Sequence, residues 1–523
     1  MRTDLVVIGA GPAGLAAALA ASARGVRVVL VDAAPEPGGQ FYRQPAPALR
    51  ARRPQALHHR WRAWTRLRDG LAASTVRVLT EHHVWCVERE SGGLTVHALP
   101  GPEQERSVEV RATAVLLATG GYETVLPFPG WTLPGVVTAG GAQAMLKGGL
   151  VVPGGTAVVA GTGPLLLPVA TALAAAGVPV AALVESTGPR RLLRHAGALA
   201  GKLPEGAGYA ARLLRHRVPF LARHTVVRAH GTSGAGSGGD RLTGVTVAAL
   251  DEHGSVRPGT ERRLPCDTLA VGHGMIPHTD LAEGLGCRLD GHAVAVDAEQ
   301  RTDVPGVWAA GESTGVGGAA HALAEGHIAG RSIAARLRGT APDPGEWAPA
   351  GRVRARMRGA AAALDSAYAP PARWTDRVTD DTVICRCEEV TAGAVREAVS
   401  LGAGDTRTVK LLSRAGMGWC QGRMCGPAVA GLTGCASAPS GRLLARPVPL
   451  GVLADAHREH EELRDREVHR DHEELRDREV HRDHEELHDR EVHREYEKHR
   501  EHEKHREKEE HRAYEDRTEE GPS

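Results

Sequence analysis

The hydrophobic pattern at the start of the chain predicts a strand, a tight turn, a helix and a second strand. The apolar run 5–8 is followed by Gly9, Gly11 and Gly14, then by an alanine-rich stretch and the strand pattern VRVVLVD, which ends at Asp32. In such a turn the first glycine permits the bend, the second lets the backbone approach a pyrophosphate, and the third lets the helix pack closely on the strand. An acid about twenty residues further on is placed to bind a ribose. The segment therefore predicts a dinucleotide-binding unit.

The same order of strand, turn, helix and strand recurs at residues 154–186. Gly161 and Gly163 match the first two glycines, Leu166 stands at the third, and Glu185 takes the place of the acid. Leu166 is expected to push the helix away from the strand or to reshape the turn, because close packing at that position normally needs glycine. The acid favours NAD over NADP. This second unit is predicted to bind NAD or another adenine nucleotide, or to be a packing domain without a ligand.

Three further segments complete the pattern of the first unit. They are Gly38, Gly39 and Gln40 in the loop PGGQFYR, Thr119 and Gly120 after an apolar strand, and Gly311 and Glu312 between an apolar strand and a helix. This combination resembles the two-dinucleotide-domain flavoproteins of the glutathione-reductase structural type. The resemblance implies an α/β, Rossmann-like fold that binds FAD. It also implies that Thr119 and Gly120 close the FAD site and that Glu312, where the family usually has aspartate, holds the ribityl and pyrophosphate portion.

Composition narrows the class of protein. The 523 residues suffice for about three folded units, 42% of them are hydrophobic, and the net charge of +1 favours neither a nucleic-acid partner nor a membrane surface. No run is long and apolar enough to span a bilayer, and the apolar N-terminus has Asp4 in front of it and almost no basic region, unlike a signal peptide. We therefore expect a cytoplasmic protein, in which disulfides are disfavoured.

Half of the eight cysteines lie in two short segments, ICRCEEVT and GWCQGRMCGP, and these are Cys385, Cys387, Cys420 and Cys425. Three interpretations are open. The expected compartment disfavours a disulfide pair, and C-x-C is too cramped for the knuckle of a structural zinc site. A two-iron cluster takes two thiolates on each iron from loops packed together. The remaining cysteines form no CxxC dithiol, and Cys86, Cys266 and Cys287 are expected in the core.

The segment between the two cysteine pairs is predicted to contain a helix. Thr391 is placed to cap it, and Val395, Val399 and Leu401 are expected to supply its apolar face. The spacing C-x-C and C-x4-C, with CRCEEVT and RAGMGWCQGRMCGP, resembles the [2Fe–2S] domain of the bacterioferritin-associated-ferredoxin (BFD-like) type. The resemblance implies that the four cysteines ligate the cluster and leaves Cys435 outside the motif.

The order of these parts resembles the A-type subunits of opine oxidases, hydrogen cyanide synthases, and proline and hydroxyproline dehydrogenases. The segments PGGQFYRQ, GTGPLLL and AAGESTGVGGA and the cysteine motif carry the likeness. The expected divisions are a first FAD-binding part at 1–125, an inserted NAD(P)-type domain at 126–265, a second FAD-binding part at 266–338, a linker at 339–380, the BFD-like domain at 381–436, an extension at 437–455 and a tail at 456–523.

The resemblance implies an FAD-dependent oxidoreductase that passes electrons between FAD and the cluster. In this family a separate flavoprotein subunit oxidises the C–N bond of an opine, proline, hydroxyproline or glycine, and a small ferredoxin-like subunit is a further expected partner. Two alternatives stay open: a stand-alone NAD(P)H-dependent reductase that feeds a protein acceptor, and a non-catalytic iron–sulfur redox sensor. No catalytic acid or base is assigned, and His321 and His327 are interpreted as packed or solvated.

After Ala456 the sequence becomes a charged repeat, HEELRDREVHRD, with a twelve-residue period. Its leucines and valines rotate around a helix and form no seam, so a coiled coil is excluded and a solvated helix or disorder is expected. Histidine pairs such as His469 with His472 and His499 with His502 raise the hypothesis of metal binding.

Overall fold

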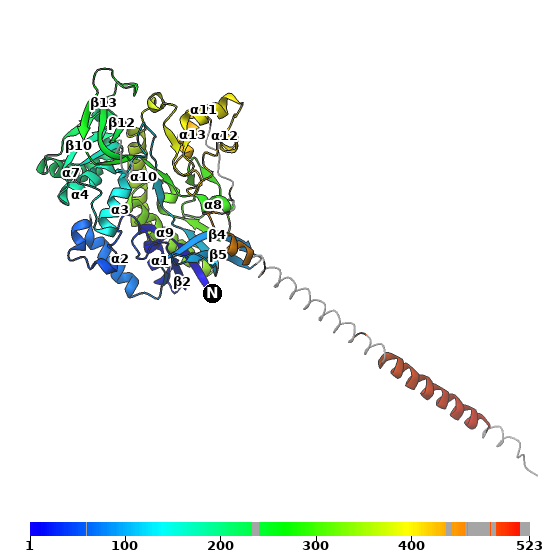
Figure 1. Ribbon diagram of the computed structural model, residues 1–523. Helices are drawn as coiled ribbons and strands as arrows, with labels where there is room; N and C mark the ends of the chain where they lie inside the picture. The colour runs from blue at the N-terminus through cyan, green and yellow to red at the C-terminus, as the bar shows by residue number, and fades with distance from the viewer. Residues whose placement is uncertain are drawn as a thin grey trace, which may run out of the picture. The chain divides into compact units, whose positions relative to one another are not determined.

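The computed structural model describes residues 1–58, 60–90, 92–232, 240–435, 442, 444–455, 458, 482 and 488–512. The chain divides into two compact units, Met1–Pro449 and Leu450–Ser523. The first unit holds a mixed sheet and a parallel sheet, both covered by helices, and a small helical domain that carries the clustered cysteines (Figure 1). The α/β architecture predicted from the sequence is therefore present.

The first sheet joins segments that lie far apart in the sequence. Its strand order is β3-β2-β1-β6-β5-β4, and β19 pairs with β6. Strands β1, β2, β3, β6 and β19 are parallel, whereas β4, β5 and β6 form an antiparallel meander. The bounds are β1 (Arg2–Ile8), β2 (Val28–Val31), β3 (Arg77–Leu79), β4 (His82–Glu90), β5 (Gly93–Pro100), β6 (Val108–Leu117) and β19 (Val307–Ala309). Because β19 adds to this sheet, the first dinucleotide fold is completed by a distant part of the chain.

Both faces of this sheet are buried. Leu5 and Val7 of β1 belong to the core beneath the helices α1 (Pro12–Ser22), α2 (Trp61–Ala72) and α9 (Ala319–Leu337), while Val6 and Ile8 belong to a second core on the opposite face. Side chains alternate along a strand, so a continuous apolar run suits a parallel strand that is covered on both sides. This explains why the run 5–8 shows no polar position.

The second sheet has the order β11-β10-β9-β15-β8, and its strands are parallel. The bounds are β8 (Val136–Thr138), β9 (Ala157–Thr162), β10 (Val180–Glu185), β11 (Phe220–Ala222) and β15 (Thr268–His273). Its helices are α3 (Ala139–Gly149), α4 (Leu166–Ala175), α5 (Pro189–Leu193), α6 (Ala196–Leu199) and α7 (Leu203–Arg215). An antiparallel sheet of β12 (His224–Thr232), β13 (Arg241–Ala249) and β14 (Arg262–Pro265) packs beside it.

The boundary between the inserted domain and the second FAD-binding part lies later than the sequence placed it. Residues from 266 onward were assigned to the FAD-binding part, but β15 pairs with β9 and β8 in the second sheet. The crossing follows His273, where β16 (Met275–Pro277) pairs with β7 (Gly121–Glu123), and α8 (Asp280–Gly284) and the hairpin of β17 (Leu289–Asp290) and β18 (Ala293–Val294) come next. Sequence reasoning missed this because β15 is a short buried strand whose pattern does not show which sheet it joins.

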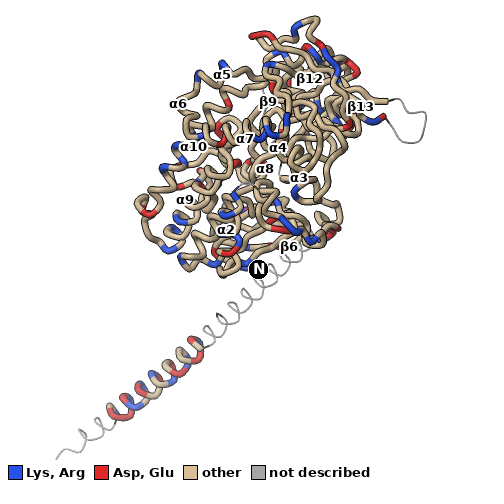
Figure 2. Tube along the Cα trace, turned by 90° about the vertical axis from the view of Figure 1, so that its left-hand side faces the viewer, with Lys and Arg blue, Asp and Glu red and all other residues tan. Residues whose placement is uncertain are grey.

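Residues 339–380, assigned to a linker, contain the long helix α10 (Ala348–Ala367). This helix packs along α9 and also touches α5 and α6 of the inserted domain (Figure 2). The segment therefore bridges both dinucleotide folds.

The cysteine-bearing domain consists of β20 (Val383–Cys385), β21 (Val390–Thr391), α11 (Ala392–Ser400), α12 (Thr406–Ser413) and α13 (Gly426–Thr433). The hydroxyl of Thr391 accepts a hydrogen bond from the backbone N–H of Ala394, so the predicted cap is confirmed. Val395 is buried, but Val399 and Leu401 are exposed. The predicted apolar face is wrong at these two positions, because Ala392, Val395 and Ala398 face the core and the helix ends at Ser400.

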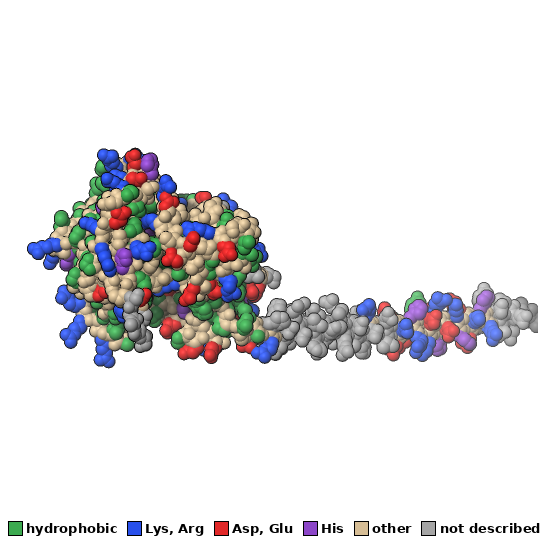
Figure 3. All heavy atoms as spheres, turned by 45° about the horizontal axis from the view of Figure 1, so that its top comes forward, with side chains coloured by type: hydrophobic (Ala, Val, Ile, Leu, Met, Phe, Trp, Pro, Cys, Tyr) green, Lys and Arg blue, Asp and Glu red, His purple; other side chains and the backbone are tan. Residues whose placement is uncertain are grey.

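In the second unit, residues 488–512 form a helix with exposed side chains. Acidic and basic positions alternate along it (Figure 2), and Arg506 lies 3.7 Å from Glu510 one turn later. His499 and His502 lie on this helix, whereas His469 and His472 fall outside the described residues. The face of the first unit visible in Figure 3 mixes charges of both signs, in keeping with the nearly neutral composition.

Candidate functional site: an FAD cradle and a four-cysteine cavity

The turn after β1 is held tightly by its glycines. Gly9 adopts φ +106°, and a Cβ there would lie 2.3 Å from the carbonyl oxygen of Ala118. A Cβ on Gly14 would lie 1.8 Å from the carbonyl oxygen of Gly9. Both positions exclude any larger residue, since the neighbouring atoms are backbone. The turn therefore brings the N-terminus of α1 against β1 and against the residue before Thr119, as the sequence predicted.

The loop that carries the second pair of glycines lies against this turn. Gly39 adopts φ +58°, and a Cβ there would lie 2.8 Å from the Cα of Gly11. Gln40 is exposed, and its side-chain carbonyl oxygen accepts a hydrogen bond from the guanidinium of Arg43 at 2.8 Å. Gly11 itself is partly exposed, so its backbone remains accessible to a ligand.

Asp32 lies at the carboxyl end of β2, where the sequence placed a ribose-binding acid. Its carboxylate accepts hydrogen bonds from the backbone N–H groups of Ala10 and Ala34, the latter at 2.7 Å. Burial raises the pKa of Asp32, although these hydrogen bonds oppose the rise. The side chain keeps partial exposure, which leaves room for further hydrogen bonds.

The turn 9–14, the loop 38–40 and Asp32 form one part of a candidate FAD site, here called the cradle. Two segments from later in the chain complete it. The hydroxyl of Thr119 donates to the carbonyl of His278 at 2.6 Å, and the backbone of Gly120 accepts from the N–H of His278 at 2.9 Å. A Cβ on Gly311 would lie 2.8 Å from the Cβ of Ala13 in α1. Burial raises the pKa of Glu312, which follows it.

A buried acid that sequence reasoning missed, Glu325, lies nearly two helix turns into α9. Glu325 is 0% exposed and accepts from the N–H of Gly311 at 2.9 Å, from the hydroxyl of Thr314 at 2.6 Å and from the guanidinium of Arg358 at 2.6 Å. The Nε2 of His321 lies 2.9 Å from the same carboxylate. Burial alone would raise the pKa of Glu325, but these partners outweigh it and lower the pKa. No sequence signal marks Glu325, because Arg358 comes from the segment assigned to a linker.

The close contact of α1 and α9 was also missed. A Cβ on Gly326 would lie 2.0 Å from the carbonyl oxygen of Ala13, and one on Gly330 would lie 2.4 Å from that of Ala17. The two helices therefore meet backbone to backbone. This contact fixes the first turn of α9 beside the first turn of α1, where both helix N-termini face the cradle.

The cradle fits the FAD that the fold implies. A Cβ added to Gly120, Gly315 or Gly318 would meet no atom within 4 Å, so these turns border open space. The Nδ1 of His321 is buried and has no hydrogen-bond partner among the described residues, and it faces Gly317 in the same turn. Two accessible helix N-termini, an acid at the end of β2 and an unpartnered buried nitrogen suit a dinucleotide with a polar ring. His321 is packed, as expected, and burial lowers the pKa of the half-buried His327.

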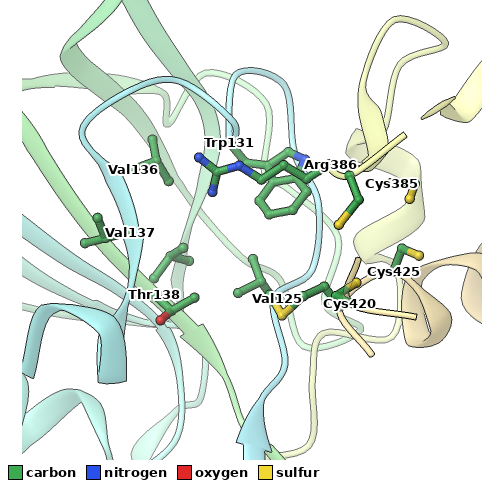
Figure 4. Close-up of a pocket in the computed structure, with 12 residues that line it drawn as sticks. Val125, Trp131, Val136, Val137, Thr138, Cys385, Arg386, Cys420 and Cys425 are labelled. Atoms are coloured by element: carbon green, nitrogen blue, oxygen red, sulfur yellow. The ribbon is translucent and has the colours of Figure 1, made fainter. Parts of the chain in front are cut away.

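The four clustered cysteines line one cavity of about 190 Å³, together with Val125, Trp131, Val136, Val137, Thr138, Val271, Arg386 and Met424. Figure 4 shows Cys385, Cys420 and Cys425 at one side of this cavity and Val136 and Val137 at the other. Cys385 and Cys425 are buried, Cys420 is partly exposed and Cys387 is exposed. All eight cysteines are free thiols, so the disulfide interpretation finds no support.

Glycines surround the four sulfurs. The backbone N–H of Gly416 points at the Sγ of Cys385 at 3.5 Å, and a Cβ on Gly418 would lie 2.2 Å from the Cβ of Cys387. Within the described residues, no three His, Cys, Asp or Glu side chains are grouped so that they could hold one metal ion. A two-iron cluster needs only two protein thiolates on each iron, and N–H groups aimed at sulfur tune such clusters. The donor set therefore fits a [2Fe–2S] cluster.

The second dinucleotide fold retains its turn but in altered form. Gly161 adopts φ +136° and its Cβ would lie 1.7 Å from the carbonyl oxygen of Gly272. Helix α4 begins at Leu166, three residues after Gly163, whereas α1 begins directly after Gly11. Leu166 is buried, and its Cδ2 would lie 3.9 Å from a Cβ placed on Gly272 in β15. The turn differs from that of the first fold, since α4 begins later, and the role of Leu166 in this difference stays a prediction.

Family comparisons agree with this geometry. Residues 3–326 match the family model of the pyridine nucleotide-disulphide oxidoreductases, and residues 383–432 match the BFD-like [2Fe-2S] binding domain. The chain is therefore an FAD-dependent oxidoreductase of the pyridine nucleotide-disulphide oxidoreductase class with an added BFD-like domain. Within that class it belongs to the family of the hydrogen cyanide synthase and opine oxidase subunits.

Two relatives and one solved structure illustrate the likeness. The chain is 38% identical to hydrogen cyanide synthase subunit HcnB of Pseudomonas aeruginosa, over 81% of this chain and 91% of that protein. It is 34% identical to the A-type subunit of the opine oxidase of Agrobacterium tumefaciens, over 82% of this chain and 84% of that protein. The crystal structure of L-proline dehydrogenase from P. horikoshii shares the fold, with a TM-score of 0.59, 18% identity, and coverage of 87% of this chain and 79% of that chain.

The comparisons decide between the interpretations of the cysteine pairs. The match to the BFD-like model favours the two-iron cluster over zinc and over a disulfide, while the assignment of the four ligands stays a prediction. In the part of the chain that the structure describes, no helix has the length and apolar character needed to cross a membrane.

Proposed function

We propose that this chain is the electron-transfer subunit of an amine or imino-acid dehydrogenase and that it moves electrons between FAD and a [2Fe–2S] cluster. The observation that carries the proposal is the link between the two sites. Arg423 lies between Cys420 and Cys425, and its guanidinium donates to Asp280, two residues after His278. The backbone of His278 in turn holds Thr119 at the FAD cradle. Partly buried polar contacts thus fasten the cysteine loop to the FAD-binding site.

When both groups are bound, FAD supplies two-electron chemistry and the cluster supplies one-electron transfer. The residues of this chain have holding and orienting roles. Gly9, Gly11 and Gly14 with Asp32 bind the nucleotide half, and Thr119, Gly311 and Glu312 border the rest of the cradle. The four cysteines ligate the cluster, and no side chain in the cradle is assigned to acid–base chemistry.

The electron donor that we propose is a separate flavoprotein subunit that oxidises the C–N bond of an opine, proline, hydroxyproline or glycine. The relatives are named as subunits of opine oxidase and hydrogen cyanide synthase, which supports a complex. A small ferredoxin-like subunit is a further proposed partner. This chain lacks a CxxC dithiol in residues 1–340, so the cluster is the proposed outlet for electrons.

Purification of the complex from its native host tests the proposal. We expect flavin absorbance, iron and acid-labile sulfide in the preparation, and a second flavoprotein among the co-purifying chains. A preparation of this chain without flavin absorbance, or one that is monomeric and reduces a protein acceptor with NADH alone, would contradict it.

The second candidate is a stand-alone NAD(P)H-dependent reductase. It is favoured by one observation, the strand–turn–helix–strand unit that keeps Gly161, Gly163 and Glu185. Under that candidate, anaerobic NADH alone bleaches the flavin, whereas under the first candidate bleaching needs both an amine and the partner flavoprotein.

A further inference from the structure

The crevice of the second dinucleotide fold is already filled by the chain itself. In doubly wound folds the adenosine ribose lies outside the carboxyl ends of the first two strands, beside the acid that ends the second strand. Here those strands are β9 and β10, and their ends present Thr162, Glu185 and Thr187. These side chains are the groups that a nucleotide would meet first.

The end of α10 lies on these residues. The hydroxyl of Thr162 donates to the carbonyl of Tyr368 at 3.3 Å, and the hydroxyl of Thr187 donates to the carbonyl of Ala367 at 3.3 Å. Ala367 is 0% exposed, which shows that the helix end is sunk into the crevice and does not rest on its rim. The polar groups of the two strand ends therefore have partners from a segment 206 and 180 residues away in the sequence.

The acid itself is enclosed. Glu185 is 6% exposed, and its two carboxylate oxygens accept from the backbone N–H groups of Gly163 at 3.1 Å and of Thr187 at 2.8 Å. Burial raises the pKa of Glu185 to about 7. Burial and the nearby Glu185 together raise the pKa of Tyr368 to about 12, so the phenol stays neutral over this acid.

The first dinucleotide fold provides an internal comparison. Its acid, Asp32, has the same type of partners, two backbone N–H groups, yet keeps partial exposure, and so does Gly11. In the second fold Glu185 and Gly163 are buried. The two folds therefore share the binding pattern but differ in access. A Cβ on Gly163 would still meet no atom within 4 Å, so the obstruction concerns the ribose position and not the turn.

Helix α10 is anchored firmly at its other contacts. Arg358 donates to the buried Glu325 at 2.6 Å, and Arg354 donates to Gln300 at 2.7 Å and to the carbonyl of Ala298 at 2.9 Å. The segment in the crevice is thus the end of a rigid helix that is fixed to the FAD-binding fold. Opening the crevice requires a shift of that helix against these partners, of which Glu325 and Gln300 are buried.

We propose that the end of α10, through the backbone of Ala367 and Tyr368, occupies the ribose position of the second dinucleotide fold and prevents NAD(P)H from binding there. The dinucleotide that this fold type implies does not fit the crevice as built. This inference goes beyond the proposed electron-transfer function, because it holds in either direction of electron flow.

The test uses the full-length protein with its FAD and cluster. NAD⁺ and NADH are titrated in turn by calorimetry, and amide hydrogen exchange is followed at residues 161–163 and 185–187. We expect no saturable binding below about 1 mM and no change in exchange. Saturable binding to the unaltered protein together with slower exchange at these two segments would overturn the inference.

Variants at Tyr368 test whether opening the crevice allows NAD⁺ to bind. Tyr368→Gly removes the phenol and loosens the helix end, and we expect NAD⁺ affinity to rise at least about tenfold, which corresponds to 1.4 kcal/mol. Tyr368→Phe keeps the ring and is expected to keep the crevice closed. A Tyr368→Gly protein that retains its FAD but binds NAD⁺ no better than Tyr368→Phe would contradict the inference. If Tyr368→Gly loses its FAD, the exchange measurement on the unaltered protein decides.

Discussion

Arg423, which lies between two of the clustered cysteines, is paired with the buried Asp280 of the FAD-binding fold. The Nη2–Oδ1 distance is 2.9 Å and the Nε–Oδ2 distance is 3.1 Å, and His278 Nε2 lies 3.0 Å from the same carboxylate. Burial would raise the pKa of Asp280, but the hydrogen bonds from His278 and Arg423 outweigh it and lower the pKa to about 2. The pair fastens the cysteine loop to the part of the chain that holds Thr119.

Asp280→Asn is expected to destabilise this junction by roughly 3 kcal/mol, because it leaves the largely buried guanidinium of Arg423 without its counter-charge. The measurement is the rate of cluster loss under chelator, read from visible absorbance, together with the melting temperature. Asp290→Asn, at an exposed acid in β17, is the matched control and should behave as the unaltered protein does. Equal rates of cluster loss in the two variants would show that the ion pair does not hold the loop.

The same acid predicts a dependence on low pH. Because the folded-state pKa of Asp280 lies below its usual value of 3.8, its stabilisation is present above that value and is lost as pH falls toward 2. Since the difference is about two pKa units, the loss is about 2 kcal/mol. The difference in melting temperature between Asp280→Asn and the unaltered protein should therefore become smaller as the pH falls, because the unaltered protein loses this stabilisation.

The proposed cluster ligands make a sharp prediction. Serine at any one of Cys385, Cys387, Cys420 and Cys425 should abolish or strongly reduce the visible absorbance and the iron content that a [2Fe–2S] cluster gives. Cys435→Ser is the control, since Cys435 lies outside the cavity and contacts the carbonyl of Gly404. Loss of iron in Cys435→Ser, with retention in Cys387→Ser, would overturn the ligand assignment.

Gly326→Ala tests the contact between α1 and α9. The new Cβ would lie 2.0 Å from the carbonyl oxygen of Ala13, so the helices must separate, and we expect a loss of about 2 kcal/mol or more and weaker FAD retention. Gly359→Ala in α10 is the control, because a Cβ there meets no atom within 4 Å. That change should stabilise by up to about 1 kcal/mol. Similar FAD content and melting temperature in the two variants would contradict the packing argument.

Arg358→Ala tests the buried acid under the cradle. Removing the guanidinium leaves the Glu325 carboxylate with one partner fewer, and we expect a loss of about 1–2 kcal/mol, moderated because Arg358 is partly exposed. Arg356→Ala on the same helix removes an exposed arginine and is expected to change stability by less than about 0.5 kcal/mol. The melting temperature of each FAD-loaded variant is the measurement. A larger effect from Arg356→Ala would place the anchoring of α10 elsewhere.

Glu185→Gln tests the enclosure of the second acid through pH. The folded-state pKa of Glu185 is raised from 4.5 to about 7, so between these values the folded protein holds a proton that the unfolded chain has released. That stabilisation is fully present below pH 4.5 and is lost as pH rises through about 7. Between pH 5 and 8 the unaltered protein should therefore lose roughly 3 kcal/mol of stability that Glu185→Gln keeps. The melting temperature of Glu185→Gln should rise relative to that of the unaltered protein over this range. A difference that stays constant with pH would show that Glu185 is accessible and ionised.

Local motifs were predictable from the sequence, and long-range partners were not. The turn of Gly9 and Gly14 and the cap at Thr391 depend on neighbours a few residues away, so spacing revealed them. The two cysteine segments were recognised in the same way. Each motif specifies its own local geometry, so the fold class and the order of the domains could be predicted from the sequence.

The missed features depend on contacts between distant segments. Glu325 gains its role from Arg358 on a helix assigned to a linker, and Arg423 gains its role from Asp280 in another domain. The carbonyl of Tyr368 accepts a hydrogen bond from Thr162, which lies 206 residues earlier in the chain. Residues from 266 onward were assigned to the FAD-binding part although β15 pairs with β9, because the sequence of a short buried strand does not show which strand it pairs with. Charge and hydrophobicity along the chain do not specify such pairings.

The most direct test of the central claim is an anaerobic reduction of the complex purified from its native host. NADH alone is added to one sample, and proline, glycine or an opine to others, while flavin absorbance and the electron paramagnetic resonance of the cluster are recorded. We predict that an amine or imino acid bleaches the flavin and produces the signal of a reduced [2Fe–2S] cluster, and that NADH alone does neither. Bleaching by NADH alone, or a reduced flavin beside a cluster that stays oxidised, would contradict the account.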